Sequence, residues 1–384
     1  MTAVCNTNPD KEHYCKKDAF YITNGGKTNM TKILIAGAGG APSEGVIRSL
    51  LMSEKHEEII GMGSVPTDLV LSHAKRKYIV PFANDAAYKD ELMKILTKEK
   101  PTLAHFQNDL EVWHASRIRD DIQSVGTKLF MPEHQVIDTC VSKWKSWVAF
   151  KKAGITVPEN IFINDEKDLK RAFRELGDHD GKIWLRAERM GGGGMGSIPT
   201  NDYDMAKSWI DRYEGWGSFI AAEMLTSQTI TWLSIWYEGE LIVAQTRKRT
   251  GWIHGNRSAS GVTGVTKVGT TCSDDAVTEI AVKSIMAVDK KPHGIFGVDL
   301  TYDSNGVPNP TEINISRFFT TIYFFTKAGL NMPVIFKDLG IYGEKPHLKK
   351  NVNPLPDGLL WLRGMDTEPR LMTHEEMQKE LIQL

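Results

Sequence analysis

The sequence has few cysteines, no long apolar run and almost no excess of charge. Its four cysteines are scattered, without a CxxC pair or Cys/His metal spacing, and its eleven histidines show no HxxxH or HxH spacing. Neither a disulfide framework nor a catalytic zinc site is therefore expected. No apolar run approaches the roughly 18 residues that a membrane-spanning helix needs. The formal net charge of −1 gives no field that would attract nucleic acid or a membrane surface.

The length and composition are those of a multidomain globular protein. A chain of 384 residues, 41% hydrophobic and 25% charged, favours two to three domains. Residues 1–30 are polar and lack the apolar core of a signal peptide. We expect a cytoplasmic protein in which residues 1–30 are a disordered N-terminal extension, unless Met30 is the natural start.

Residues 31–140 are expected to form a small doubly wound α/β domain. A buried strand at 32–36 runs into a glycine-rich turn at 37–45 and then into a helix, the opening of a βαβ unit. Further elements are expected at the strands 59–62, 78–81 and 103–106 and at the helix 88–98. An NAD site would also need an acid at the end of the second strand, where the sequence has Gly61-Met62-Gly63-Ser64. A tight structural turn is therefore favoured over NAD binding.

A helix is expected to follow Ser142, its N-cap, and to stop at Gly154. We expect its buried stripe to consist of Trp144, Trp147 and Val148. Lys143 lies off that stripe and, considered alone, would be a surface lysine.

The densest glycine stretch of the chain follows a short strand at 183–186. Arg186 ends the strand, and Gly191, Gly192, Gly193 and Gly194 come soon after it. Consecutive glycines are entropically costly, but their backbone N–H groups can close over the phosphates of a nucleotide. The run continues into Ser197-Ile198 and not into polar low-complexity sequence, so a phosphate flap is favoured over a flexible linker.

Basic residues follow a predicted hairpin of strands 230–237 and 240–245, joined at Glu238-Gly239. The basic residues and a nearby histidine are Arg247, Lys248, Arg249 and His254. They are candidates for holding a carboxylate or a transferred phosphate, and a surface cluster is the alternative. A helix is expected over 275–288.

A second predicted hairpin carries oxygen ligands. Strands at 295–302 and 311–315 flank a turn at 303–306. Alternation gives each strand one polar face, with Asp299 on the first strand and Glu312 and Asn314 on the second. If the two faces coincide, these three side chains suit Mg²⁺ carried with a nucleotide. By alternation alone, a solvated outer face is as good an interpretation.

The order of these features along the chain resembles the ATP-grasp superfamily, over about residues 31–345. It looks closest to proteins related to the carbamoyl-phosphate synthase large subunit and to carboxylate–amine ligases. The segment 142–158 matches the family's helix opened by a lysine or arginine, and Glu312-Ile313-Asn314-Ile315-Ser316-Arg317 resembles its Glu-x-Asn-Pro-Arg motif.

The resemblance implies an α/β and α+β chain built of successive units. They are a Rossmann-like pre-ATP-grasp domain (31–140), subdomain A with the glycine flap (141–220), subdomain B with the metal site (221–345) and a C-terminal segment (346–384).

The resemblance also assigns site residues. Phosphate contacts fall to Lys143, Arg186 and the flap glycines 191–194, adenine contacts to Glu223, Met224 and Leu225, and metal ligands to Asp299, Glu312 and Asn314. The expected cofactors are ATP and Mg²⁺, with Mn²⁺ as an alternative. Arg317, displaced by one residue from the family's arginine, joins Arg247 and Arg249 as a candidate catalytic cation. Where the family often has an acid for the ribose, this sequence has Gln228, Thr229 and Thr231.

The implied activity is that of an ATP-dependent carboxylate–amine ligase working through an acyl-phosphate. Its partners would be a small carboxylate and a small amine, and a homodimer is one assembly that fits. An ATP-grasp carboxylase or kinase for a small acid, and a non-catalytic nucleotide-binding regulatory module, are the alternatives. Four polar residues near a strand end of the first domain could face the acceptor or be ordinary loop polarity: His105, Asn108, Asp109 and Glu111.

Overall fold

The computed structural model describes residues 31–189, 196–261, 265–365 and 370–380. The expected extension at residues 1–30 and the flap glycines 191–194 lie outside these ranges. Among the helices within them, none is long and apolar enough to cross a membrane.

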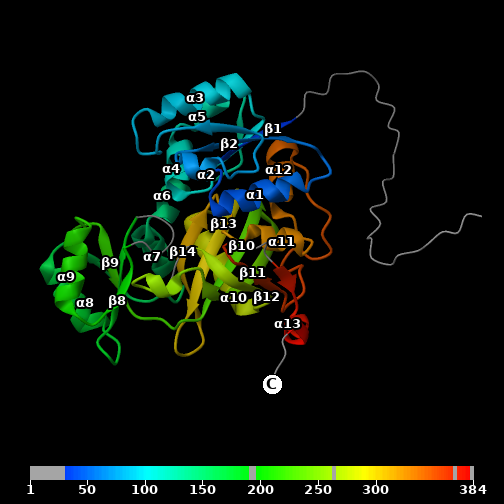
Figure 1. Cartoon of the computed structure of the whole chain (residues 1–384). Coiled ribbons are helices and arrows are strands. Elements are labelled where there is room, and N and C mark those ends of the chain that lie inside the picture. The colour runs from blue at the N-terminus through cyan, green and yellow to red at the C-terminus, as the bar shows by residue number, and fades with distance from the viewer. Residues whose placement is uncertain (1–30, 190–195, 262–264, 366–369, 381–384) are drawn as a thin grey trace, which may run out of the picture. The chain divides into compact units, whose positions relative to one another are not determined.

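The described strands form three sheets (Figure 1). In chain order the strands are β1 (Lys32–Ala36), β2 (Glu58–Gly63), β3 (Arg76–Ile79), β4 (Leu103–His105), β5 (Lys128–Leu129), β6 (Asn160–Ile163), β7 (Ile183–Ala187), β8 (Ile198–Thr200), β9 (Phe219–Ala222), β10 (Thr229–Tyr237), β11 (Glu240–Trp252), β12 (Thr266–Cys272), β13 (Gly294–Tyr302), β14 (Pro308–Ile315), β15 (Leu360–Leu362) and β16 (Arg370–Met372).

Helices cover the faces of these sheets. They are α1 (Ala41–Leu51), α2 (Pro66–Leu69), α3 (Tyr88–Glu99), α4 (Asp109–Arg117), α5 (Arg119–Ser124), α6 (His134–Val141), α7 (Lys143–Lys152), α8 (Glu166–Leu176), α9 (Tyr203–Arg212), α10 (Asp275–Val288), α11 (Ile322–Lys327), α12 (Met332–Tyr342) and α13 (His374–Glu380), with a short 3-10 turn at Gly255–Arg257.

The first sheet is parallel, in the order β3-β2-β1-β4-β5, as expected of a doubly wound domain. It packs tightly at Gly61, where a Cβ would lie 2.8 Å from the Cβ of Ala38 and 2.9 Å from that of Ala74. The third strand begins two residues earlier than the sequence predicted. Its register with β2 pairs Arg76 with Ile60 and ends where Ile79 meets Gly63, so the neighbouring strand sets its bounds.

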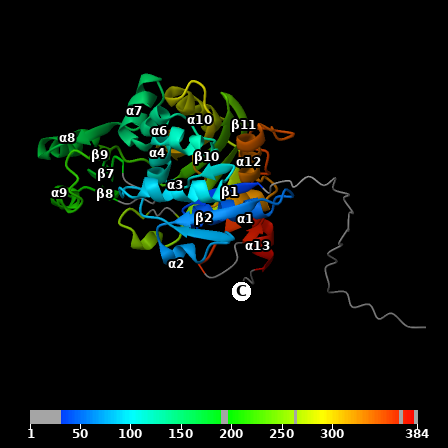
Figure 2. The same ribbon diagram turned by 90° about the horizontal axis from the view of Figure 1, so that it is seen from above.

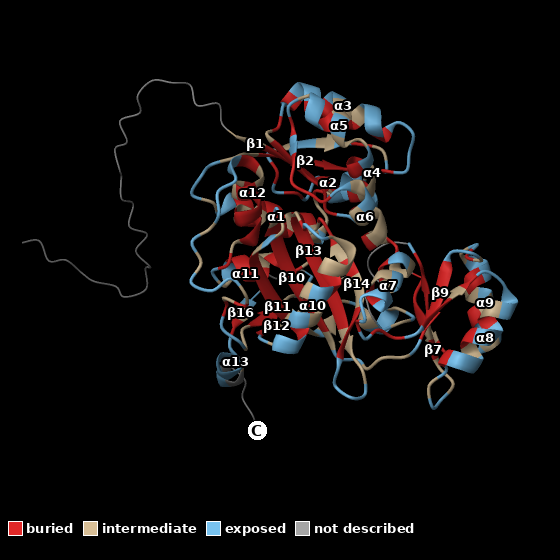
Figure 3. Ribbon diagram, turned by 180° about the vertical axis from the view of Figure 1, so that it is seen from behind, coloured by how far each residue is buried: buried red, intermediate tan, exposed pale blue. Residues whose placement is uncertain are grey.

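The second sheet is antiparallel, in the order β6-β9-β7-β8. Helices α8 and α9 cover one of its faces (Figure 3). The buried side chains of Leu169, Leu185, Ile210 and Phe219 make the core between helices and sheet. This small layer positions β7, the strand that carries Arg186.

The third sheet is also antiparallel, in the order β14-β13-β10-β11-β12-β15-β16. One face packs on α10, through Trp232, Val298 and Val277. The other packs on α11 and α12, through residues such as Leu233 and Phe324. Figure 2 shows α10 on the side of β10 away from α1. Polar side chains of the central strands continue the second face, and these build the site described next.

Candidate functional site

A cavity of about 1020 Å³ is bordered by β7, by the segment that joins β9 to β10 and by the β13–β14 hairpin. This volume is at the upper end of the roughly 300–1,000 Å³ usual for small-molecule sites. Many of the residues singled out from the sequence line it: Lys143, Arg186, Glu223, Met224, Leu225, Gln228, Thr229, Lys248, Arg249, Asp299 and Glu312.

The two polar faces of the β13–β14 hairpin do coincide. Asp299 pairs in register with Glu312, and Asn314 lies opposite Gly297. The Asn314 Nδ2 donates to the Asp299 Oδ2 over 3.1 Å. Among the described residues no group of three His, Cys, Asp or Glu side chains could hold a metal ion. This set of two carboxylates and one amide would need further oxygen atoms, such as phosphate oxygens and water, to complete a magnesium shell.

Each of the two carboxylates faces a cation. The Arg249 Nη1 lies 3.4 Å from the Asp299 Oδ2, and the Lys143 Nζ lies 3.8 Å from the Glu312 Oε2. Thr231 donates to the Asp299 Oδ1 over 2.5 Å. Burial raises the pKa of Asp299, but Arg249, this hydrogen bond and Arg247 together hold the pKa below its usual value. Asp299 is therefore an anionic oxygen donor, as a metal ligand must be.

Lys143 is the first residue of α7, and Ser142 caps the helix by accepting from the Lys145 N–H over 3.0 Å. The predicted buried stripe is wrong. Helix α7 buries Ser146 and Phe150, whereas Val148 is 45% exposed. Positions 143, 146 and 150 share one helix face, so Lys143 belongs to the buried face and its side chain is only 15% exposed. Burial lowers the pKa of Lys143, and Glu312 opposes the shift.

The two tryptophans explain the error. Trp144 and Trp147 stack with their ring centroids 4.8 Å apart, and both are half-buried. The Trp147 Nε1 donates to the Pro158 carbonyl over 2.9 Å. Indoles are amphipathic, so they can pack along the surface, and here the Trp147 N–H keeps a hydrogen-bond partner.

Arg186 is buried and incompletely paired. Its Nη2 donates to the Thr311 carbonyl over 3.4 Å, and its Nε has no partner among the described residues. Burial lowers the pKa of Arg186. A guanidinium that lines a cavity with an unused donor is suited to an anion, and above all to phosphate. The flap glycines that follow it fall in the undescribed segment.

The segment after β9 is fixed to the start of β6. The Glu223 Oε2 accepts from the Glu159 N–H over 2.8 Å, and the Glu223 N–H donates to the Glu159 carbonyl over 3.1 Å. The carboxylate of Glu223 thus holds the backbone in place. Thr229, a little further on, lines the cavity with a hydroxyl that lacks a partner in the described parts of the chain.

Arg247, Lys248 and Arg249 lie within β11, not after the strand as predicted, because β11 continues through two register shifts to Trp252. Alternation turns Arg247 and Arg249 to one face and leaves Lys248 exposed. Arg247 is only 1% exposed, so the surface-cluster interpretation does not hold for it. His254 lies apart from them, with its Nε2 3.0 Å from the Met365 sulfur.

The direct contacts of Arg247 among the described residues are to neutral groups, and Asp299 is a more distant negative neighbour. Its Nη2 donates to the Thr231 hydroxyl over 3.2 Å and its Nη1 to the Thr321 hydroxyl. Its guanidinium lies 4.1 Å from the centroid of the Phe319 ring. Burial, together with Arg249, lowers the pKa of Arg247 to about 9.

Arg317 is held by Asp109, the first residue of α4 in the domain of the parallel sheet. Its Nε and Nη2 donate to the Asp109 carboxylate over 2.5 and 3.1 Å, and its Nη2 also donates to the Asn314 Oδ1. Burial lowers the pKa of Arg317, but Asp109 more than offsets this and raises it. Arg317 does not line the cavity, but it contacts Asn314. Asn314 is one of the three predicted metal ligands, which we call the oxygen trio: Asp299, Glu312 and Asn314.

Of the four polar residues of the first domain, only Asp109 contacts a predicted site residue. Asn108 caps α4. The Glu111 carboxylate is buried against Asn108 and Tyr88, and burial raises its pKa to about 7. The His105 ring is hydrogen-bonded to the Gln107 side chain, and burial lowers the pKa of His105 to about 4.

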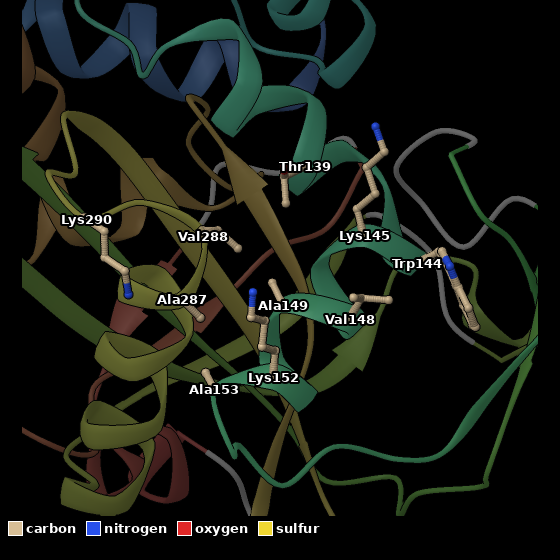
Figure 4. Close-up of a pocket in the computed structure, with 10 residues that line it drawn as sticks. All are labelled: Thr139, Trp144, Lys145, Val148, Ala149, Lys152, Ala153, Ala287, Val288 and Lys290. Atoms are coloured by element: carbon tan, nitrogen blue, oxygen red, sulfur yellow. The ribbon is translucent and has the colours of Figure 1, made fainter.

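A second cavity, of about 740 Å³, lies between α7 and α10 (Figure 4). Its lining includes Trp144, Val148, Ala149 and Val288. None of the site residues predicted from the sequence borders it.

No protein-family model and no curated protein matches the sequence, whereas solved structures do match the fold. Carboxyaminoimidazole ribonucleotide synthase from Aspergillus clavatus, complexed with ATP, has a TM-score of 0.65 at 15% identity, over 87% of this chain and 82% of that one. The biotin carboxylase domain of 2-oxoglutarate carboxylase from Hydrogenobacter thermophilus, with MgADP and bicarbonate, has a TM-score of 0.65 at 15% identity, over 87% and 74%. L-amino acid ligase from Bacillus licheniformis has a TM-score of 0.61 at 10% identity, over 86% and 78%.

Proposed function

We propose that this chain, which has the ATP-grasp fold of those enzymes, is an ATP-dependent carboxylate–amine ligase. One observation carries the proposal. Two cations and two carboxylates from distant parts of the sequence, Lys143, Arg186, Asp299 and Glu312, border a single cavity. Such a combination is what a magnesium–triphosphate complex requires, with cations for the phosphates and oxygen donors for the metal.

The nucleotide would lie along the cavity from the segment after β9 to the β13–β14 hairpin. In this arrangement Glu223, Met224 and Leu225 contact adenine, while Lys143 and Arg186 contact the phosphates, covered by the flap glycines 191–194. Asp299, Glu312 and Asn314 hold Mg²⁺ or Mn²⁺, whose charge offsets that of the phosphate oxygens. The ATP and the MgADP in two of the matching structures support this use of the fold.

The reaction needs little beyond positioning and charge stabilisation. An oxygen of the substrate carboxylate attacks the γ-phosphorus in line, the bond to the β-phosphate oxygen breaks, and ADP leaves. An amine then attacks the carbonyl carbon of the acyl-phosphate, inorganic phosphate leaves, and the amine nitrogen loses a proton. Arg249 contacts Asp299, Arg317 contacts Asn314, and Arg247 is linked to Asp299 through Thr231. We assign these three arginines to the acid and to the transferred phosphate.

The decisive experiment follows ADP and inorganic phosphate while small acids are screened with Mg-ATP, with and without amines. Phosphate release that requires an amine, together with the amide in the mass spectrum, supports the ligase. ADP release that requires bicarbonate would assign a carboxylase. A phosphorylated acid as the final product would assign a kinase. Nucleotide binding without ADP release from any acid would favour a regulatory module and contradict the proposal.

Glu312→Ala is the sharpest variant for the metal assignment. We expect turnover to fall by about 10²-fold or more, since a proposed metal ligand beside the phosphates is lost, while nucleotide binding weakens much less. The matched control is Glu279→Ala, because Glu279 is exposed on α10, pairs with Lys283 and does not line the cavity. Unchanged turnover in Glu312→Ala would remove Glu312 from the site.

A further inference from the structure

In the described parts of the chain, two guanidinium groups close to one another, those of Arg247 and Arg363, have no carboxylate within ion-pair distance. Arg247 is buried in β11, and Arg363 follows β15 and is half-buried. They reach adjacent residues: Arg247 donates to the Thr321 hydroxyl, and the Arg363 Nη1 donates to the Thr320 carbonyl over 2.9 Å. The Arg247 Nε and the Arg363 Nε and Nη2 are buried without a partner in the described residues. Within those residues, neither guanidinium forms an ion pair.

The surroundings add further positive charge. Arg249, two residues from Arg247 on the same face of β11, has an unpaired Nε and a single carboxylate neighbour, Asp299, at 3.4 Å. That carboxylate is already assigned to the metal. Among the described residues, Arg247 and Arg249 thus have the Asp299 carboxylate as their shared negative neighbour, and Arg363 has none. A buried charge without a counter-ion is strongly destabilising.

The fold makes room for this arrangement. Gly269 of β12 lies beside Arg249 in register, and a Cβ at position 269 would come within 3.1 Å of the Arg247 Cδ. On the other side, the Phe319 ring supports the guanidinium. The arginine cluster is thus built into the sheet and is not an accident of flexible side chains.

We propose that Arg247 and Arg363 bind a second anionic group of the acid substrate, so that the substrate is a dianion, such as a dicarboxylate or a phosphonate-bearing acid. This inference rests on the proposed function, because it names the substrate class of the same site.

The register of the sheet gives the substrate its orientation. Thr231 pairs with Asp299 on one side and with Arg247 on the other. The two side chains converge over Thr231, whose hydroxyl accepts from the Arg247 Nη2 over 3.2 Å and donates to the Asp299 Oδ1 over 2.5 Å. The carboxylate that reacts lies at the Asp299 end, beside Arg249. The second anionic group, which does not react, lies beside Arg247. Arg247 and Arg363 together neutralise the charge of this group. A short acid, with its two anionic groups only a few carbon atoms apart, fits this arrangement.

The test compares acids matched in length. Binding of succinate against butyrate, and of glutarate against pentanoate, is measured by calorimetry with Mg-ADP present, and ADP release is measured with the same acids and Mg-ATP. The dianion of each pair should bind more tightly. Arg363→Met should weaken dianion binding by about 30-fold or more, and leave the binding of monoanions and Mg-ADP unchanged.

Two controls keep the outcome interpretable. Arg363→Lys keeps the charge but loses the paired geometry of a guanidinium, so its loss of affinity should be intermediate. Arg212→Met, on the exposed face of α9, should change nothing. The affinity for Mg-ADP, measured in every variant, reports that each is folded.

The outcomes separate this inference from the proposed function. Equal binding of dianions and monoanions, or an Arg363→Met variant that discriminates as well as the original protein, would overturn the dianion site. Turnover confined to monocarboxylates would do the same and leave the ligase standing. Tight, Arg363-dependent binding of dianions without ADP release would retain the site and contradict the ligase. If 3-phosphonopropionate binds more tightly than succinate, the second group is a phosphonate or phosphate, and the reverse order makes it a carboxylate.

Discussion

Thr231 is the residue at which the acidic and the basic halves of the site meet. Its hydroxyl accepts from the Arg247 Nη2 and donates to the Asp299 Oδ1. A hydroxyl has a single hydrogen, and the side of the Thr231 oxygen that faces Arg247 must accept a hydrogen bond. The Thr231 hydrogen is therefore directed at the Asp299 carboxylate. Thr231 therefore orients Asp299 without being a metal ligand itself. The sequence offered Thr231 only as a polar residue near the ribose, since its partners come from two other strands.

Replacing Thr231 by valine should weaken metal binding. The change keeps the shape of the side chain but leaves the Asp299 Oδ1 and the Arg247 Nη2 without their partner. We expect the Mg²⁺ concentration for half-maximal ADP release to rise by about 10- to 100-fold, the usual effect of losing an outer partner of a ligand. Thr231→Ser, which restores the hydroxyl, should return it towards the original value. An unchanged Mg²⁺ dependence in the valine variant would show that Thr231 has no such role.

Glu111 gives a pH-dependent prediction. Burial raises its pKa from 4.5 to about 7, so between these values the folded protein holds a proton that the unfolded chain has lost. Stability should therefore fall as pH rises through this window and stay reduced above it. Glu111→Gln keeps a neutral hydrogen-bonding group, and should raise the free energy of unfolding by roughly 2–3 kcal/mol at pH 8 and by little at pH 5. Urea unfolding at both pH values measures this, and an equal effect at both would contradict the assignment.

At the scale of elements, periodicity located most helices and strands but could not settle which face is buried. The strand at 32–36 and the helix at 275–288 have the predicted bounds. The first is a short apolar run that ends at a glycine-rich turn, and the second has apolar residues at helical spacing. In α7 the same reasoning assigned the tryptophans to the buried face. The packed face instead contains Lys143, whose side chain faces Glu312 on β14 of the seven-stranded sheet. A partner that distant leaves no local pattern. The length of β11 was missed for a related reason, since residues 246–249 are polar and basic and are held in the strand by regular pairing with β12.

Ser142→Ala tests whether the start of α7 positions Lys143. Ser142 accepts from the Lys145 N–H and donates to Glu188, so its loss should cost about 1–2 kcal/mol of stability and also raise the KM for ATP. Asp202→Ala is the matched control, since Asp202 caps α9 by accepting from the Met205 N–H and is absent from the cavity lining. A control that raises the KM as much as Ser142→Ala would show that the effect is general destabilisation.

At the scale of the whole molecule, the parallel sheet and the seven-stranded sheet are joined by specific polar contacts. Asp109 holds Arg317, and the Gln107 Oε1 accepts from the Phe318 N–H over 2.8 Å. A buried ion pair joins Lys337 of α12 to Glu57, just before β2. The order of motifs along the chain was enough to predict the ATP-grasp fold. These pairings were out of reach, because nothing near Arg317 in the sequence indicates Asp109.

The buried pair predicts a specific pattern of stability. Lys337→Met should destabilise the protein by about 3–5 kcal/mol, because it leaves Glu57 buried without its partner. The double variant Glu57→Gln with Lys337→Met should recover most of that loss, since no buried charge remains. Urea unfolding of both variants measures the difference. If the double variant is less stable than the single one, the two side chains are not coupled in this way.

Gly269 has a consequence for the history of the chain. Glycine in the interior of a strand weakens a sheet, and here its lack of a side chain leaves the space that the stem of Arg247 fills. Gly269 and Arg247 should therefore be lost together in evolution. Once Arg247 has been replaced, a β-branched residue at position 269 would no longer clash with its side chain and could be accepted. Descendants that still use the same acid should retain both, and those that have changed acid should have lost both. Such co-variation would allow the substrate preference of a relative to be inferred from two positions.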